Sequence, residues 1–340
     1  MASFTSIPPE LHSYIFQLGC TDDGTTIRAL SLLSRYFYAI AGPLLYHTLS
    51  ISVSSPNDHL PLLLKKLQAT PPHLRRISHL FLSDVPSSPS SSASTPQKLS
   101  EPALSNLFDL LTLASPSLRT LSFIAHAPHT STHIIARLFR TSFPLLSELS
   151  VSGYYPFPSP PPFPREAPNP TQTPRMPSLK KLHLHGNRNP HGLLQSRSLE
   201  GACPALEELR VSGLAMASSF VIEVEDALLA CVSSSSSSSS SDDALLFPAS
   251  LPPNIKSVIV QAGVRPPAVG AKPPTAVVLL KDDAMMRQLE RIREVARDAE
   301  REGVRVSVLD RPEEAISPAE MKKVWLDGVG GRSRDGWWCS

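Results

Sequence analysis

The sequence has few cysteines, and they lie too far apart to organise a site. Cys20, Cys203, Cys231 and Cys339 include no Cys-x-x-Cys pair. Cysteines spaced in this way form neither a zinc site nor a disulfide framework, so the sequence indicates a reducing compartment.

Charge is also scarce and nearly balanced. Charged residues make up 18% of the 340 residues, and the net charge is +2. This balance gives no reason to expect nucleic acid or an anionic membrane as a partner. No apolar stretch reaches the roughly twenty residues that a membrane span needs, and the first residues lack the basic start of a signal peptide. We therefore expect a soluble, intracellular protein, in the cytoplasm or in the nucleus.

The motifs of common enzymes are absent from the sequence. There is no Gly-x-Ser-x-Gly elbow, no phosphate loop ending in Gly-Lys-Ser/Thr and no His-Glu-x-x-His. The paired acids Asp282-Asp283 precede a helical run, so we interpret them as N-terminal caps. We expect a protein that is not an enzyme and that needs no cofactor.

Two histidines come closest to a metal site. His183 and His185 are two positions apart on an expected strand, so both point to one face. No nearby Cys, Asp or Glu completes a ligand set, and exposed surface histidines are the better interpretation. We expect no metal.

The N-terminal residues predict three short helices. Pro8 and Pro9 suit the first turn of a helix that Gly19 ends, and Thr25 or Thr26 can cap a second helix. A third helix continues through the apolar residues of 37–41. Helices of this size bury too little surface to be stable alone, so their apolar faces need the rest of the chain or another protein.

The same stretch resembles a known family. Ile-Pro-x-Glu-Leu-x-x-x-Ile-Phe over 7–16, followed by Ile-x-x-Leu-Ser-Leu-Leu-Ser-Arg-x-Phe over 27–37, resembles an F-box. The resemblance implies docking onto a Skp-type adaptor of a cullin-based ubiquitin ligase, while the remaining chain selects a target protein. It places these residues at adaptor-facing or helix-packing positions: Ile7, Pro8, Leu11, Ile15, Phe16, Leu30, Leu33 and Phe37. The chain departs from the family at Ile7, where Leu is usual, and at 36–38, where many members carry Trp.

A second pattern returns along the rest of the chain. The motif apolar-x-x-apolar-x-apolar recurs at 77–82, 118–123, 146–151, 179–184, 206–211 and 255–260. The closest copies give a period of about 27–28 residues, which is typical of leucine-rich repeats. The copy from Leu179 to Asn187 has the full form of that repeat. We therefore predict an α/β fold, with an N-terminal three-helix F-box-like module followed by an irregular leucine-rich-repeat solenoid.

Periodicity places the other elements. A strand is expected at 48–53, and connecting helices at 59–69, 102–113, 132–139 and 220–232. Near the C-terminus we expect a strand at 275–280, a long helix at 282–303 and a strand at 304–309. Ser317 and Glu320 form a capping box that begins a helix through Trp325.

Composition defines the domains and inserts. Proline and serine tracts near 86–98, 154–177 and 233–243 predict unstructured insertions. The expected domains are the helical module at 1–48, the repeats at 49–310, and a C-terminal helix with a loose tail at 311–340.

If the repeat leucines point inward, the alternating residues form an outer strand face. This face would hold a target protein through His79, Phe81, Thr120, Ser122, Glu148, Ser150, Lys181, His183, His185, Glu208 and Arg210. We expect a substrate-recognition subunit of a cullin-type ubiquitin ligase that acts by binding alone. The alternative is a non-catalytic interaction scaffold whose F-box-like segment does not engage the ligase. A third hypothesis, less favoured than these two, is a hydrolase on a repeat scaffold.

Overall fold

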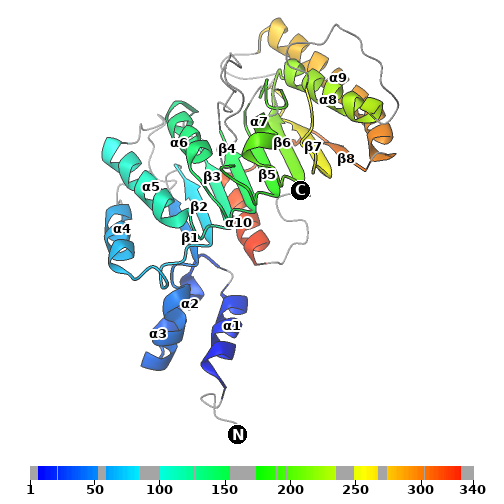
Figure 1. Cartoon of the computed structure of the whole chain (residues 1–340). Helices are drawn as coiled ribbons and strands as arrows, with labels where there is room; N and C mark the ends of the chain where they lie inside the picture. Colours follow the sequence, from blue (N-terminus) through cyan, green and yellow to red (C-terminus); the bar gives the residue numbers. More distant parts are fainter. Residues whose placement is uncertain are drawn as a thin grey trace, which may run out of the picture. The chain divides into compact units, whose positions relative to one another are not determined.

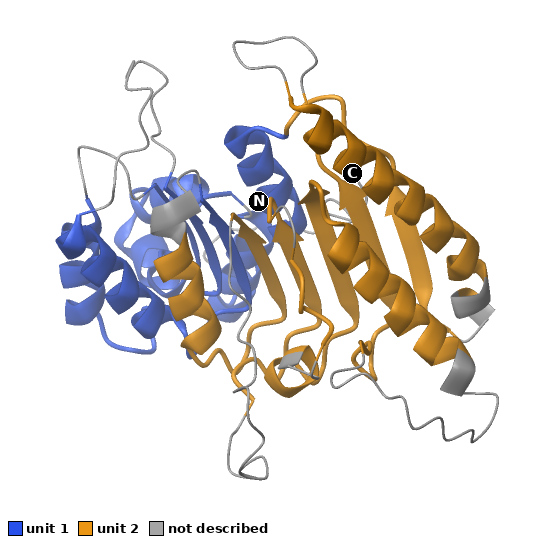
Figure 2. Ribbon diagram, turned by 90° about the horizontal axis from the view of Figure 1, so that it is seen from above, with its two compact units in different colours: residues 1–126, 316–340 blue, residues 127–315 orange. Residues whose placement is uncertain are grey.

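Short parallel strands alternate with helices along the chain, which has a mixed α/β fold (Figure 1). The computed structural model describes residues 7–20, 22–52, 59–84, 100–125, 128–153, 174–187, 190–195, 198–234, 249–266, 274–301 and 303–330. Contacts divide the chain into two compact units, residues 1–126 with 316–340 and residues 127–315 (Figure 2). The predicted division at residues 48 and 310 follows sequence motifs and stays a prediction.

Unit 1 holds the N-terminal helices, three parallel strands and the last helix of the described chain. Its elements are α1 (Pro9–Gly19), α2 (Thr25–Ser31), α3 (Arg35–Ala41), the 3₁₀ helix η2 (Gly42–Leu44), β1 (Thr48–Ser52), α4 (Leu60–Ala69), β2 (His79–Ser83), α5 (Glu101–Ala114), β3 (Thr120–Ile124) and α10 (Pro318–Val329). The strands pair in the order β1-β2-β3. Helices α4 and α5 lie on one face of these strands and α10 lies on the other (Figure 1).

Unit 2 repeats the same alternation. Its elements are α6 (Pro128–Arg140), β4 (Glu148–Ser152), β5 (Lys181–His185), α7 (Ser198–Ala202), β6 (Glu208–Leu214), α8 (Ser218–Ser234), β7 (Ser257–Ala262), α9 (Ala276–Arg301) and β8 (Arg305–Leu309). The strands pair in sequence order, all parallel. Helices α8 and α9 pack side by side and cover one face of the strands (Figure 2).

The repeat motif sets the strand register in both units. Its second apolar position pairs with the same position in the next strand, Leu80 with Leu121 in unit 1 and Leu182 with Leu209 in unit 2. These leucines are almost completely buried. Because the side chains of a strand alternate between two faces, one register places the inner apolar positions of all repeats in the core. The predicted strands at 48–53 and in the six motif copies are confirmed, as are the four predicted connecting helices.

A glycine with a left-handed backbone lies near the end of β6 and close to the adjacent repeat. Gly213 has φ +74°, and a Cβ atom there would lie 2.9 Å from the backbone N of Gly186. The register also shifts between Val211 and Leu214. Only glycine permits both this backbone conformation and this approach of two adjacent repeats.

The predicted strand at 275–280 is wrong. Helix α9 runs without interruption from Ala276 to Arg301, and the Thr275 carbonyl accepts a hydrogen bond from Val278 N–H at 2.9 Å. The β-branched residues there favour a strand by propensity. The apolar stripe farther along, with Met285 and Leu289 buried, stabilises a helix instead, and residues 276–280 form the first turns of that helix. Asp282 is therefore inside the helix and is not a cap. Its carboxylate instead pairs with both terminal nitrogens of Arg311, at 2.7 and 2.8 Å.

The predicted inserts fall mostly outside the described residues, which omit 85–99, 154–173 and 235–248. The described residues at the ends of two predicted inserts are part of the folded structure. Met176 is buried and the Arg175 carbonyl accepts from Phe143 N–H at 2.7 Å, so the unstructured insert does not extend through 174–177. Ser233 and Ser234 lie in the last turn of α8. The predicted loose tail is also outside the described residues from 331 on, whereas Gly328 and Val329 are part of α10.

Candidate functional site

The three N-terminal helices form a small closed core. Phe16 of α1, Ile27 of α2 and Ala41 of α3 are buried together, and Phe37 packs against them. Ser34 caps α3 by accepting from Phe37 N–H at 3.1 Å. The N-cap residue of α2 is Gly24, in place of the predicted Thr25 or Thr26, and the Asp22 carboxylate accepts from Thr26 N–H in the first turn at 2.8 Å. We call α1, α2 and α3 together the helical module.

The opposite face of α1 is apolar and exposed. Leu11, Tyr14, Ile15 and Leu18 have the spacing of one helical stripe, and about half of each side chain is open to solvent. We call these four residues the apolar stripe of α1. Four more large apolar or aromatic side chains of this segment are exposed: Leu32, Leu33, Tyr36 and Tyr38. An exposed apolar patch of this kind marks an interaction site more often than a scattered surface residue does.

The structure separates the predicted adaptor-binding residues into three groups by their exposure to solvent. Pro8, Leu11, Ile15 and Leu33 are exposed, as docking requires. Phe16 is 4% exposed and belongs to the core of the module. Three residues are half-buried: Ile7, Leu30 and Phe37. Of these, Leu30 and Phe37 pack against the core of the module.

A buried histidine, which sequence reasoning missed, joins α1 to α3. His12 is fully buried, and its Nδ1 lies 2.9 Å from the hydroxyl oxygen of Tyr36. Its ring also packs edge-on against Phe37. The signal in the sequence is the four-residue spacing from His12 to Phe16, which puts both on one side of α1.

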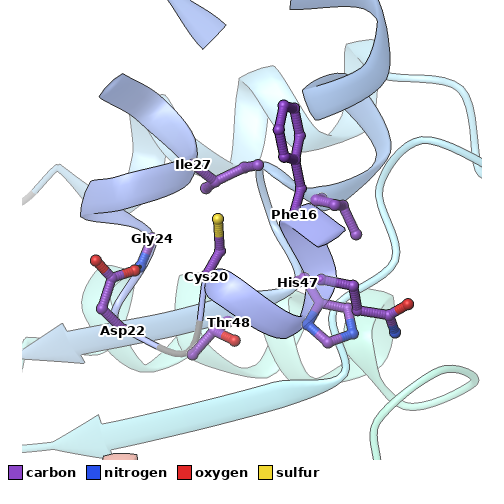
Figure 3. A pocket seen from close by; sticks show the side chains of 9 residues that line it. Phe16, Cys20, Asp22, Gly24, Ile27, His47 and Thr48 are labelled. Carbon is purple, nitrogen blue, oxygen red and sulfur yellow. The ribbon is translucent and has the colours of Figure 1, made fainter. Parts of the chain in front are cut away.

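A hollow lies at the junction of α1, α2 and β1 (Figure 3). It is lined by Phe16, Gln17, Cys20, Asp22, Gly24, Ile27, Leu44, His47 and Thr48. Burial and then the nearby Asp22 carboxylate raise the pKa of the Cys20 thiol, so this cysteine is not activated as a nucleophile. The hollow therefore has a lining of mixed polarity and no activated thiol.

In unit 1 the predicted target-binding face is largely covered. Phe81 is 3% exposed because the ring of Trp325 in α10 lies over it, with ring centroids 5.4 Å apart. Ser122 is also buried. His79 and Thr120 are half-buried and lie 2.8 Å apart from Nδ1 to Oγ1. The expectation of an open surface is therefore wrong for this part of the face.

The pKa of His79 is strongly perturbed. Burial lowers it to about 3, with further contributions from His47 and Arg119. The two imidazole rings of His47 and His79 lie 5.0 Å apart. Both rings are therefore neutral near pH 7, which allows them to pack together without repulsion.

In unit 2 the predicted face is a hydrogen-bonded ladder of polar side chains. The Ser212 hydroxyl lies 2.7 Å from His183 Nε2 and 2.8 Å from His185 Nδ1. Arg210 donates to the Gln261 side chain at 3.1 Å. The prediction of exposed histidines is wrong for His183, which is 3% exposed because the parallel register sets neighbouring side chains against it.

The edge of this ladder is charged. Lys181 lies 3.6 Å from Glu208 on the adjacent strand. Burial raises the pKa of the neighbouring Glu148, while the Lys181 charge opposes that shift. Ser150 is half-buried on the same face. Within the described part of the chain, no group of three or more His, Cys, Asp or Glu residues could hold a metal ion.

One further buried carboxylate was not predicted. Glu223 of α8 accepts hydrogen bonds from the N–H groups of Gly192, at 2.7 Å, and of Leu194. Burial raises its pKa, and the backbone donors oppose that shift. Glu223 stands inside an apolar helical run, so nothing in the sequence marks its partners. Its geometry holds the loop after β5 and does not form an open site.

Comparison of the chain with protein-family models, with curated proteins and with solved structures gave no significant match in any of the three. Among the described helices, none combines the length and the apolar character that crossing a membrane requires.

Proposed function

We propose that this protein is a substrate-recognition subunit of a cullin-type ubiquitin ligase. The helical module acts as an F-box-like domain that binds a Skp-type adaptor, and the strand–helix repeats form an irregular leucine-rich-repeat domain that binds a target protein. The protein contributes binding alone, and catalysis takes place elsewhere in the complex. The observation that carries this proposal is the apolar stripe of α1.

The stripe supports docking because the module does not need it for its own core. Phe16 and Ile27 close the core on the other side of α1. Full burial of a Leu or Ile side chain contributes roughly 1.5–3 kcal/mol. An adaptor that covers Leu11, Ile15 and Leu18 thus gains binding free energy while the module keeps its internal packing.

The strand register supports the repeat part of the proposal. Within each unit, a strand pairs in parallel with the strand of the next repeat and aligns the same apolar position, as Leu149 does with Leu182. Repeats of this kind stabilise one another through their shared core and leave one strand face for a partner. The polar ladder of His183, His185 and Ser212 belongs to that face.

Co-purification with a Skp-type adaptor tests the proposal. The wild type is compared with Leu11→Asp/Ile15→Asp, which puts two charges on the stripe, and each charge would be buried without a partner on docking. A matched control is Val277→Asp/Leu280→Asp, which makes the same change at two exposed positions of α9. We expect the wild type and the control to retain the adaptor and the α1 variant to lose it. The proposal fails if the wild type does not bind the adaptor, or if the folded α1 variant binds as well as the control.

A second candidate is an interaction scaffold whose helical module does not engage the ligase. Tyr36 favours it, because this residue stands where many F-box members carry Trp and its hydroxyl is used internally, 2.9 Å from His12 Nδ1. A protein of this kind would co-purify with other partners through its strand face and never with the adaptor.

A further inference from the structure

Helix α10 returns to unit 1 and packs on the strand face there. Met321 and Trp325, four residues apart, are buried against Phe81 of β2 and Ile124 of β3. Leu326 and Val329 pack against the same cluster. The contact has the form of an amphipathic helix that inserts bulky side chains into an apolar site.

The start of α10 is specified locally. The Ser317 side chain accepts from Glu320 N–H at 3.2 Å, and the Glu320 carboxylate accepts from Ser317 N–H at 2.9 Å. Pro318 occupies the first turn. Because these groups satisfy the helix N-terminus without the strands, the helix begins independently of its docking.

An exposed connection precedes the helix. Arg311 is held in unit 2 by its paired contacts with Asp282. Residues 313–316 are exposed and form no helix or strand. Helix α10 is therefore joined to the rest of the chain by a tether that does not itself fix it on the strand face.

The polar contacts of α10 with unit 1 are incomplete. The Trp325 Nε1 atom is buried and has no hydrogen-bond partner among the described residues. The Lys322 ammonium pairs with Asp23, in the loop before α2, at 3.0 Å, but about a third of each side chain is exposed. A buried donor without an acceptor weakens a packed contact, and an exposed ion pair adds little to it.

We propose that the strand face around Phe81 and Ile124 is a binding site for an amphipathic helix. Helix α10 occupies this site in the free protein, and a helix of the target protein displaces it. The chemistry of α10 defines the partner: two bulky apolar or aromatic residues four positions apart, and a basic residue next to the first of them that faces Asp23. The identity of the partner as a target rests on the proposed function, but the site itself does not involve the adaptor.

The test uses a fluorescent peptide with the sequence of residues 316–330 and the full-length protein. In the wild type the internal helix competes with the peptide. In Met321→Asp/Trp325→Asp the internal helix cannot dock, since it would bury two charges. We expect the variant to bind the peptide at least tenfold more tightly than the wild type does, and a peptide with the same two substitutions to bind neither protein.

If the variant keeps its helical circular dichroism and cooperative unfolding but binds the peptide no more tightly than the wild type, α10 is a fixed part of unit 1 and the inference is overturned. Because the variant can fail to fold, a protease site inserted between Glu314 and Ala315 of the otherwise native chain gives a second measurement. After cleavage, the α10 fragment should leave on dilution, and the emptied site should then bind the added peptide. A fragment that never leaves, or a remainder that unfolds when it leaves, also overturns the inference. No adaptor is present in either measurement, so their failure is separate from a failure of the proposed function.

Discussion

Phe81 in β2 lies against Trp325 in α10, with their ring centroids 5.4 Å apart and the rings tilted by 47°. The two residues come from near opposite ends of the described chain. Their contact covers part of the strand face that the repeat pattern predicts to be open. The part of this face that unit 1 exposes therefore depends on α10 as well as on the repeats.

The Phe81–Trp325 contact should stabilise the state in which α10 is docked on unit 1. We expect Trp325→Ala to lower the free energy of unfolding by about 3–5 kcal/mol, the usual cost of removing a large aromatic side chain from a core. Trp325→Phe should cost much less, because it keeps an aromatic ring and removes the buried indole N–H that has no hydrogen-bond partner among the described residues. Urea unfolding of the full chain measures both values. Equal losses for the two variants would contradict this account.

The aligned leucines predict where substitutions destabilise most. Leu80 and Leu182 are completely buried at the shared register position of units 1 and 2. We expect Leu80→Ala and Leu182→Ala each to cost about 2–5 kcal/mol, since each leaves a cavity in the core. Leu32→Ala is the matched control: Leu32 is 85% exposed, and its loss should change stability by less than about 0.5 kcal/mol. Thermal and urea unfolding distinguish the core positions from the control, and similar effects at all three sites would rule out the register as the source of stability.

The sequence predicts local features of this fold well. The period-two apolar pattern determines the strands and their register, because a slip of one residue at Leu149 or Leu209 would move every inner leucine to the outer face. The capping box of Ser317 and Glu320 fixes the start of α10 in the same way, through contacts three residues apart.

The features that the sequence does not predict depend on distant partners. Nothing near Trp325 indicates that it packs against Phe81, and nothing near Asp282 indicates its pairing with Arg311. The burial of His183 likewise depends on side chains from adjacent strands. The same holds for the candidate site: helical spacing predicts the apolar stripe of α1, whereas the covering of the strand face by α10 is a tertiary contact.

The half-buried His79 predicts a loss of stability in acid. Its pKa is about 3 in the folded protein, against about 6.5 in an unfolded chain, so between these values the unfolded state binds more protons. The contribution of neutral His79 to the unfolding free energy is therefore fully present above about pH 6.5 and is lost as the pH decreases toward 3. Lowering the pH from 7 to 5 should cost about 2 kcal/mol from this residue. The Asn side chain of His79→Asn cannot titrate. Between pH 7 and pH 5 this variant should therefore lose about 2 kcal/mol less unfolding free energy than the wild type, which gives a smaller slope against pH. An unchanged slope would show that other groups cause the acid sensitivity.

The ion pair of Lys322 with Asp23 connects α10 to the loop between α1 and α2, and a charge reversal tests its contribution. Lys322→Glu places two carboxylates together and should destabilise the docked α10, whereas Asp23→Lys combined with Lys322→Glu restores an attractive pair. Because about a third of each side chain is exposed, the coupling energy should be about 0.2–1 kcal/mol and should decrease with added salt. A double-mutant cycle on the unfolding free energy measures it, with Lys323→Glu, the next lysine of the same helix, as the control for helix charge. If Lys322→Glu and Lys323→Glu have the same effect, and the reversed pair recovers nothing, the two residues are neighbours without energetic coupling, and α10 is held by its apolar side chains alone.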